Sequence, residues 1–242
     1  MSYQLTKKME KMKEKNIVFS VILLLLFGSS SSLAQDCEIY FPTEEGSMVE
    51  MTNYNGKGKV ESVGQTTILK KEVSSGDVIL TARLFELSND NKDTVDIEYT
   101  CGCINGTFEV GLFTGLSTES LGGLLEVGGD KLDIPSNPNE GDVLEDKQVI
   151  VKIGASEEME NGLLNMKYNF TNRKVEEVGS MKTKAGEFKF IKMSYDLSTR
   201  FIVPVNYHVI EWYSTEVGLI RSEMYNKKGK LMSSSEITGY SK

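Results

Sequence analysis

The chain has 242 residues, and its 27 basic and 35 acidic side chains give a formal net charge of −8. Hydrophobic residues make up 39% and aromatic residues 9% of the sequence, which is enough for a packed core and argues against a disordered chain. The acidic balance makes nucleic acid a poor partner, because phosphates repel an acidic surface.

The N-terminal 34 residues have the layout of a cleavable signal peptide. Lysines up to Lys15 precede an apolar run at 17–27, which is followed by Gly28, four serines and Ala34. A membrane-spanning helix needs roughly 20 apolar residues, and this run has about half that number. We therefore expect cleavage after Ala34 and no transmembrane anchor in the mature protein.

Removal of residues 1–34 would leave a single domain at 35–242. This part contains 22 basic and 33 acidic residues, so its formal charge is −11. A start at Met1, Met9 or Met12 would give the same product, and the sequence does not choose among them. The expected location of the mature protein is the periplasm or cell envelope.

Three cysteines remain in the mature chain, and in an oxidising compartment they can form at most one intramolecular disulfide. A ring closed between Cys101 and Cys103 would be strained, so we expect Cys37 to pair with either Cys101 or Cys103. With the single histidine His208, the C-G-C sequence lacks the ligand pattern of a zinc site. Lipidation of Cys37 is not expected, because Asp36 stands where a small residue is needed.

Apolar and polar residues alternate along most of the chain, which predicts strands. In chain order, the predicted strands cover 48–54, 78–87, 94–101, 107–113, 149–153, 164–170, 187–195, 205–213, 217–225 and 231–237. The alternation is clearest at 164–170, where Leu, Met, Tyr and Phe alternate with Asn, Lys and Asn. The one helix candidate is 117–125.

Turn-forming glycines, asparagines and prolines separate the predicted strands. Long amphipathic helices between strands are missing, which argues against a parallel doubly wound sheet. A sheet of so many strands must curve and close on itself, because exposed edge strands would pair with other chains. We therefore predict an all-β, mainly antiparallel protein: a single closed or half-open β-barrel of roughly ten to twelve strands with at most one short helix.

Two segments of the chain echo each other. Residues 54–60 and 225–231 share Tyr, Asn, Lys, Gly and Lys in register, which is typical of a strand, a tight turn and a returning strand. A duplicated half-barrel or independent use of the same turn chemistry would explain the match. The flanking residues differ, which favours independent use.

The sequence contains no recognisable catalytic set. His208 alone would have to serve any serine or cysteine nucleophile, and the best nucleophile-elbow candidate, at 115–119, lacks its second glycine. Phosphate-binding loops are also missing. We therefore assign no catalytic residues and no cofactor, and an enzyme is the less favoured interpretation.

Acidic residues are dense in the loop-rich stretch 130–146. Asp130, Asp133, Asp142 and Asp146 are weak candidates for calcium ligands, because their order lacks the regular positions and closing glutamate of a calcium loop. A solvated acidic loop explains them better, and no metal site is assigned.

Several segments, most of them in the C-terminal third, carry a family resemblance. They are K-A-G-E-F at 184–188, E-W-Y at 211–213, and the stretches 216–223 and 225–231, together with F-P at 41–42, Gly46 and the hairpin at 54–59. These segments resemble the TapB-like family, exported bacterial proteins of undefined biochemical role. The resemblance implies a barrel-like antiparallel fold in the envelope and brings no catalytic residues. Phe190 stands where that family often has a cysteine, so the disulfide pairing of relatives need not transfer.

The leading functional hypothesis is an exported, non-catalytic envelope protein that binds a small lipophilic ligand in a concave interior. The ligand-binding residues cannot be named from the sequence. One alternative is a structural or interaction protein whose barrel is packed and whose partner is an envelope protein. A third is a carboxylate-dependent hydrolase of envelope glycans or peptides.

Overall fold

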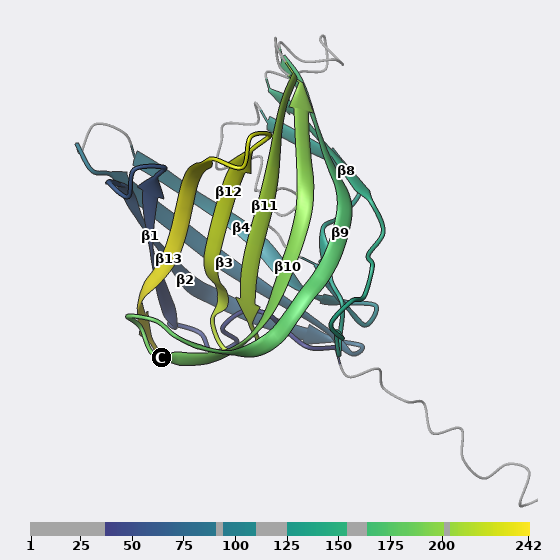
Figure 1. Cartoon of the computed structure of the whole chain (residues 1–242). Helices are drawn as coiled ribbons and strands as arrows, with labels where there is room; N and C mark the ends of the chain where they lie inside the picture. Colours follow the sequence, from purple (N-terminus) through teal and green to yellow (C-terminus); the bar gives the residue numbers. More distant parts are fainter. Residues whose placement is uncertain (1–36, 91–93, 110–124, 154–163, 201–203) are drawn as a thin grey trace, which may run out of the picture. The chain divides into compact units, whose positions relative to one another are not determined.

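A computed structural model describes residues 37–90, 94–109, 125–153, 164–200 and 204–242 (Figure 1). The described residues form 13 antiparallel strands in one sheet, and no helix occurs among them. The strands are β1 Met48–Asn55, β2 Val60–Ser74, β3 Asp77–Ser88, β4 Thr94–Ile104, β5 Thr107–Glu109, β6 Leu125–Gly129, β7 Asp133–Ile134, β8 Lys147–Ile153, β9 Leu164–Lys182, β10 Glu187–Arg200, β11 Pro204–Ser214, β12 Gly218–Asn226 and β13 Leu231–Ser241. Among these residues nothing forms a helix able to cross a membrane.

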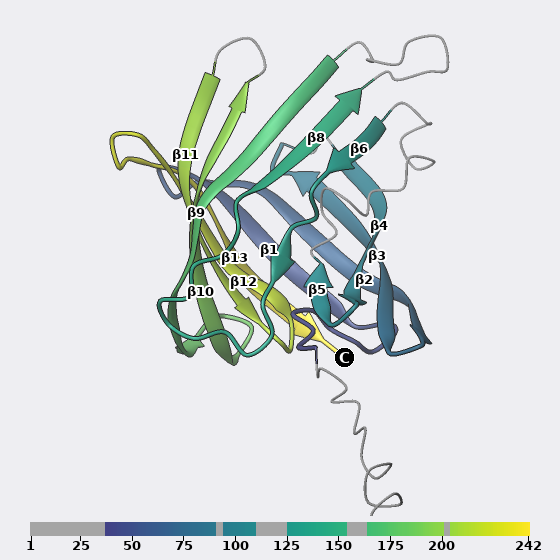
Figure 2. The same ribbon diagram turned by 90° about the vertical axis from the view of Figure 1, so that its right-hand side faces the viewer.

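The strand order is β6-β8-β9-β10-β11-β12-β13-β1-β2-β3-β4-β5-β7. The pairing of β1 with β13 joins the N-terminal strands to the C-terminal ones and curves the sheet round (Figures 1 and 2). The edge strands β6 and β7 are consecutive in the chain, with only residues 130–132 between them. No ladder of hydrogen bonds joins these two edges in the described part of the chain, so the predicted barrel is half-open.

The strand predictions were accurate in kind and incomplete in number. Each predicted strand overlaps an observed one, although only Thr107–Glu109 of the segment 107–113 is described. Three strands were missed, β2, β6 and β7, so the expected count of ten to twelve was too low. Most of the helix candidate 117–125 lies outside the described residues, and its last residue begins β6.

The concave face of the sheet carries the main apolar core. Residues paired across an antiparallel ladder share a face, so the pairs Ile68–Ala82, Ala82–Tyr99 and Leu80–Cys101 place these side chains together. The buried members of this core are Tyr40, Ile68, Leu80, Ala82, Tyr99, Cys101, Phe108, Ile134, Val175, Ile191 and Met193. They come from both halves of the chain, so this core holds the curved sheet together.

A second core lies where the turn end of the long β9–β10 hairpin meets β1 and β13. Phe188 and Phe190 pack there with Trp212, Ile220 and Ile237. At the hairpin tip, Lys184 Nζ donates a hydrogen bond to the Tyr54 hydroxyl at 3.2 Å. Figure 1 shows the hairpin sweeping beneath the neighbouring strands to reach this position.

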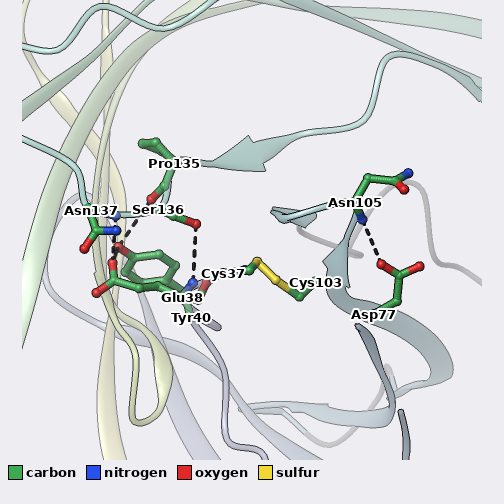
Figure 3. Close-up of a disulfide and its surroundings, with 9 residues drawn as sticks. All are labelled: Cys37, Glu38, Tyr40, Asp77, Cys103, Asn105, Pro135, Ser136 and Asn137. Atoms are coloured by element: carbon green, nitrogen blue, oxygen red, sulfur yellow. Dashed lines mark hydrogen bonds between the residues drawn. A yellow bond between two sulfur atoms is a disulfide. The ribbon is translucent and has the colours of Figure 1, made fainter. Parts of the chain in front are cut away.

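The described segment before β1, residues 37–47, is fastened across one end of the barrel by a disulfide. The structure pairs Cys37 with Cys103, which resolves the alternatives left by the sequence, and Cys101 stays free and buried (Figure 3). The Tyr40 hydroxyl donates to Glu38 Oε2 at 2.8 Å, and the Tyr40 ring lies 6.0 Å from that of Phe108. The segment therefore acts as a plug rather than as a free tail.

Arg173 on β9 reaches across the gap between the sheet edges. Its Nη1 donates to Asp133 Oδ1 at 3.0 Å and to the Glu145 carbonyl at 2.8 Å, and its Nη2 donates to the Asp133 carbonyl at 2.6 Å. The Arg173 side chain is only 4% exposed. A buried guanidinium thus ties edge strand β7 to β9, where backbone pairing is missing.

The echoing segments form the same turn. In each, an asparagine side-chain oxygen accepts two backbone N–H groups, from Lys57 and Lys59 at Asn55 and from Lys228 and Lys230 at Asn226. The glycines at the fourth turn position have positive φ in both segments. The structure therefore shows identical local turn chemistry, as the sequence match indicated.

We expect loss of the disulfide to lower the free energy of unfolding by about 2–4 kcal/mol. The bridge closes a loop with a sequence separation of 66, and its main effect is to restrict the unfolded chain. Denaturant unfolding of Cys37→Ala/Cys103→Ala would measure this. Cys101→Ala is the control. Reductant should still lower its free energy of unfolding, whereas the double variant should no longer respond to reductant. A double variant as stable as the wild type would contradict this structural role.

We expect Arg173→Met to cost about 3 kcal/mol, because it leaves Asp133 and two carbonyl groups without their buried donor. The matched control is Arg83→Met. Arg83 pairs with Asp96 on the surface, with side chains 51% and 44% exposed, so its loss should cost much less than the loss of Arg173. Equal costs in denaturant unfolding would show that Arg173 does not close the barrel.

Candidate functional site

The concave face is packed at one end and opens toward the other. Every second residue of β4 points to this face. Cys103, Cys101 and Tyr99 are buried, Ile97 is half-buried and Val95 is 43% exposed. Exposure therefore rises steadily along a single strand.

The opposite wall shows a shallower gradient, because Val149, Val151 and Phe170 form a third buried cluster against which its outer residues pack. On β10, Ile191 and Met193 are buried, whereas Tyr195 and Leu197 on the same face are only half-buried. Strands β4 and β10 belong to opposite sides of the curved sheet (Figures 1 and 2). The described side chains thus fill one end of the barrel, and at the other end they leave the β4 wall more exposed than the wall at β8–β10.

A carboxylate lies on the concave face between the packed and open ends. Glu211 Oε2 accepts a hydrogen bond from the Tyr213 hydroxyl at 2.9 Å, and the Tyr195 hydroxyl also bonds to this carboxylate. Burial raises the pKa of Glu211, while the bonds from Tyr213 and Tyr195 and the charge of Arg173 act in the opposite direction. Burial also raises the pKa of both tyrosines, so their hydroxyls remain donors at neutral pH.

Another polar group lies on the wall formed by β13, β1, β2 and β3. Asn53 Nδ2 donates to Ser62 Oγ at 2.9 Å and to Glu86 Oε1 at 3.1 Å, and Ser235 Oγ donates to Asn53 Oδ1 at 2.6 Å. Ser62 Oγ also donates to Glu86 Oε1. The open end of the concave face is therefore more polar than the packed end.

On the outer face, a groove of about 700 Å³ runs along β10 and β11 beside the β12–β13 turn. His208, the lone histidine, lies in this groove, where its Nδ1 is 2.9 Å from Asp196 Oδ1. Asn172 Nδ2 donates to the other oxygen of Asp196 at 2.8 Å. These bonds, the one with His208 first, lower the pKa of the Asp196 carboxyl.

Neither surface assembles a nucleophile with its base in the described residues. Cys101 is the free thiol, and burial raises its pKa to about 12, so it remains protonated and unreactive at neutral pH. The His208 ring is bonded to the Asp196 carboxylate, and no serine or cysteine among the described residues is hydrogen-bonded to it.

The structure places the four calcium candidates separately, each with a donor of its own. The candidates are Asp130, Asp133, Asp142 and Asp146. In the same order, their donors are the Gln148 backbone N–H, the Arg173 guanidinium, the Asn139 backbone N–H and the Asn172 backbone N–H. Across the described ranges, no three His, Cys, Asp or Glu residues are grouped to hold a metal ion. These carboxylates fasten loops and the barrel edge.

The sequence pointed to Glu211 only as part of the E-W-Y resemblance at 211–213, not as a site residue, and it did not point to Arg173. A signal for Glu211 was present, because it falls at an inward position between Val209 and Tyr213 of an alternating strand. Arg173 had no comparable signal. Its partner Asp133 lies 40 residues away in the chain, on a strand of two residues.

A family model described as DUF3108-like matches residues 44–237. A search of curated proteins gave no match. Among solved structures, a Bacteroides fragilis protein classed as exported, with a YmcC-like fold, is 19% identical and has a TM-score of 0.67. A Parabacteroides distasonis protein classed as a lipoprotein is 21% identical, with a TM-score of 0.68. Each comparison covers 85% of this chain and 100% of the other, and at these identities the likeness concerns the fold.

We expect the free energy of unfolding to fall less steeply at acidic pH in Asp196→Asn than in the wild type. The folded pKa of Asp196 is lowered, so its ionised form contributes stability that is present above the unfolded value of about 3.9 and lost as the pH falls through the folded value. Both Asp196 and His208 are about half exposed, so solvent screening limits the effect to under about 1 kcal/mol.

Urea unfolding at several pH values between neutral and about 2.5 would measure this effect. His208→Gln should reproduce most of it, since the His208 bond is the largest cause of the lowered pKa. If the loss of stability at acidic pH were the same in Asp196→Asn as in the wild type, the stabilising role of ionised Asp196 would be contradicted.

Proposed function

The chain belongs to the DUF3108-like family, and from this premise we propose that it is an exported, non-catalytic protein of the cell envelope that binds a small lipophilic ligand in the open part of its barrel. The rise in exposure along the concave face carries the proposal. Ile97 on that face is half-buried and Val95 is 43% exposed, so both side chains keep surface that a ligand could cover. Apolar walls with a few convergent polar groups are typical of small-molecule sites.

Glu211 and its tyrosine partners suit the polar end of such a ligand. The carboxylate lies just beyond the buried core, and Ser222 is its register partner on β12. An apolar chain would contact the half-buried wall, and a hydroxyl or amide head group would bond to Glu211, Tyr195 or Tyr213. The ligand we propose is therefore amphipathic rather than purely hydrocarbon.

Export is supported by the signal-like layout of residues 1–34 and by structural neighbours classed as exported or as a lipoprotein. In this chain Cys37 forms a disulfide with Cys103, so its thiol is engaged and not free to carry a lipid. We therefore propose release as a protein without a lipid at Cys37. Within the family, we also propose kinship with TapB-like proteins, on the resemblance at 211–231.

A second candidate function, an interaction protein of the envelope, is favoured by apolar side chains exposed on β2 and β3. Val73 is 67% exposed, Phe85 41% and Ile79 37%. A protein partner would cover such residues. We do not extend the proposal to a hydrolase, because the four candidate aspartates are engaged by loop and edge donors.

Native mass spectrometry of the protein purified from its host's envelope tests the ligand proposal. We expect an extra mass that is removed by denaturation and extracted with lipids. Ser222→Trp should abolish it by filling the space beside Glu211. The control Ser234→Trp places the same side chain on the outer face, opposite Glu223, and should leave the extra mass unchanged.

A fluorescent fatty-acid probe gives a second readout. Uptake by the wild type and by Ser234→Trp, but not by Ser222→Trp, would support the proposal. A bare protein that also takes up no probe would overturn it. Recovery of a protein partner instead of a small molecule would favour the interaction function.

A further inference from the structure

The turns of the β1–β2 and β12–β13 hairpins touch at one end of the sheet. Strands β1 and β13 are paired, with Asn55 opposite Ser233. A Cβ atom added to Gly56 would lie 2.2 Å from the Leu231 carbonyl oxygen, which no side chain can tolerate. The absence of a side chain at Gly56 therefore allows the two turns to meet.

This contact gathers five exposed lysines, Lys57, Lys59, Lys227, Lys228 and Lys230, which we call the lysine rim. Neither turn, 55–59 or 226–230, contains an acidic residue. Both turns have their backbone fixed by the same asparagine bonds, so the positions of the lysine backbones are set. The lysine rim is thus a fixed cluster of positive charge.

Nearby acidic residues offset only part of the positive charge of the lysine rim. No ion pair joins any of its lysines to an acid in the structure as described. Glu223, on the adjoining strand β12, is held by the Arg221 guanidinium and the Tyr225 hydroxyl. Glu61 is exposed and follows the first turn by two residues, so it offsets part of the charge.

The remainder of the domain has the opposite charge. Apart from the lysine rim, residues 35–242 carry 17 basic and 33 acidic side chains. An anionic surface would therefore repel most of the molecule and attract this end, which orients the approach. Met232, beside the rim, is 40% exposed and adds an apolar contact at the same place.

We propose that the lysine rim docks this protein on a membrane surface rich in anionic phosphate head groups. Lysines act as point charges for phosphate, and the rim contains no arginine for bidentate recognition of a particular group. Exposed turn tips suit an extended charged plane, where each lysine adds to the attraction. This inference goes beyond ligand binding and does not rest on it, because the rim lies outside the concave face.

Vesicle sedimentation tests the proposal, with protein expressed with its own N-terminal segment and purified as its host processes it. We expect binding to vesicles of equal parts phosphatidylglycerol and phosphatidylcholine, and none to phosphatidylcholine alone. Binding should fall steeply between about 50 mM and about 500 mM NaCl, because salt screens exposed charges. Changing all five rim lysines to Gln should weaken it by roughly a hundredfold.

The matched control removes five exposed lysines elsewhere: Lys71→Gln, Lys167→Gln, Lys182→Gln, Lys189→Gln and Lys242→Gln. It makes the same change in net charge and should weaken binding by less than about threefold. Equal losses in the two variants would overturn the proposal, as would a wild type that ignores anionic vesicles at low salt. Retention on heparin that depends on the rim, without vesicle binding, would also overturn it in favour of a soluble polyanion.

Discussion

A buried cation, Arg173, is the main side-chain link at the seam of the sheet, where backbone bonds also join residues 141–144 to β9. A curved sheet of 13 strands brings its two edges near each other, but these edges are not joined by a ladder in the described residues. Arg173 supplies three hydrogen bonds at this seam, two to Asp133 and one to the Glu145 carbonyl. Because the guanidinium is buried, water cannot replace it. If it moved away, these acceptors would lose their donor, and that loss costs free energy. The concave face has its shape only while the seam holds.

The two ends of the barrel differ from each other in how their interior is filled. At the packed end, the N-terminal segment, the disulfide and the aromatic contacts of Tyr40 and Phe41 fill the interior. At the other end, alternate side chains become exposed, and polar groups such as Asn53 and Glu86 appear among them. One face of a single sheet thus provides both a rigid base and an accessible wall.

Much of this fold could be predicted from residue alternation, and much of the site could not. The strand at 164–170 was clear because its apolar side chains all face the same way, whereas β2 was missed because Gly64, Thr66 and four charged residues blur its pattern. The pairing of Cys37 depended on the register of β4, which places both Cys101 and Cys103 on the concave face. Arg173 and Asp133 meet only through the closure of the barrel, which no local pattern encodes.

The short link from β6 to β7 has a further consequence for association. An open sheet presents two edges with unpaired backbone groups, and foreign strands can add to them. Here residues 130–132 connect one edge directly to the other, and the Asp130 backbone N–H and side chain both bond to Gln148 of β8. Because this short link holds the two edges together at one end, we expect it to hinder the addition of a foreign strand to either edge without needing a fully bonded barrel.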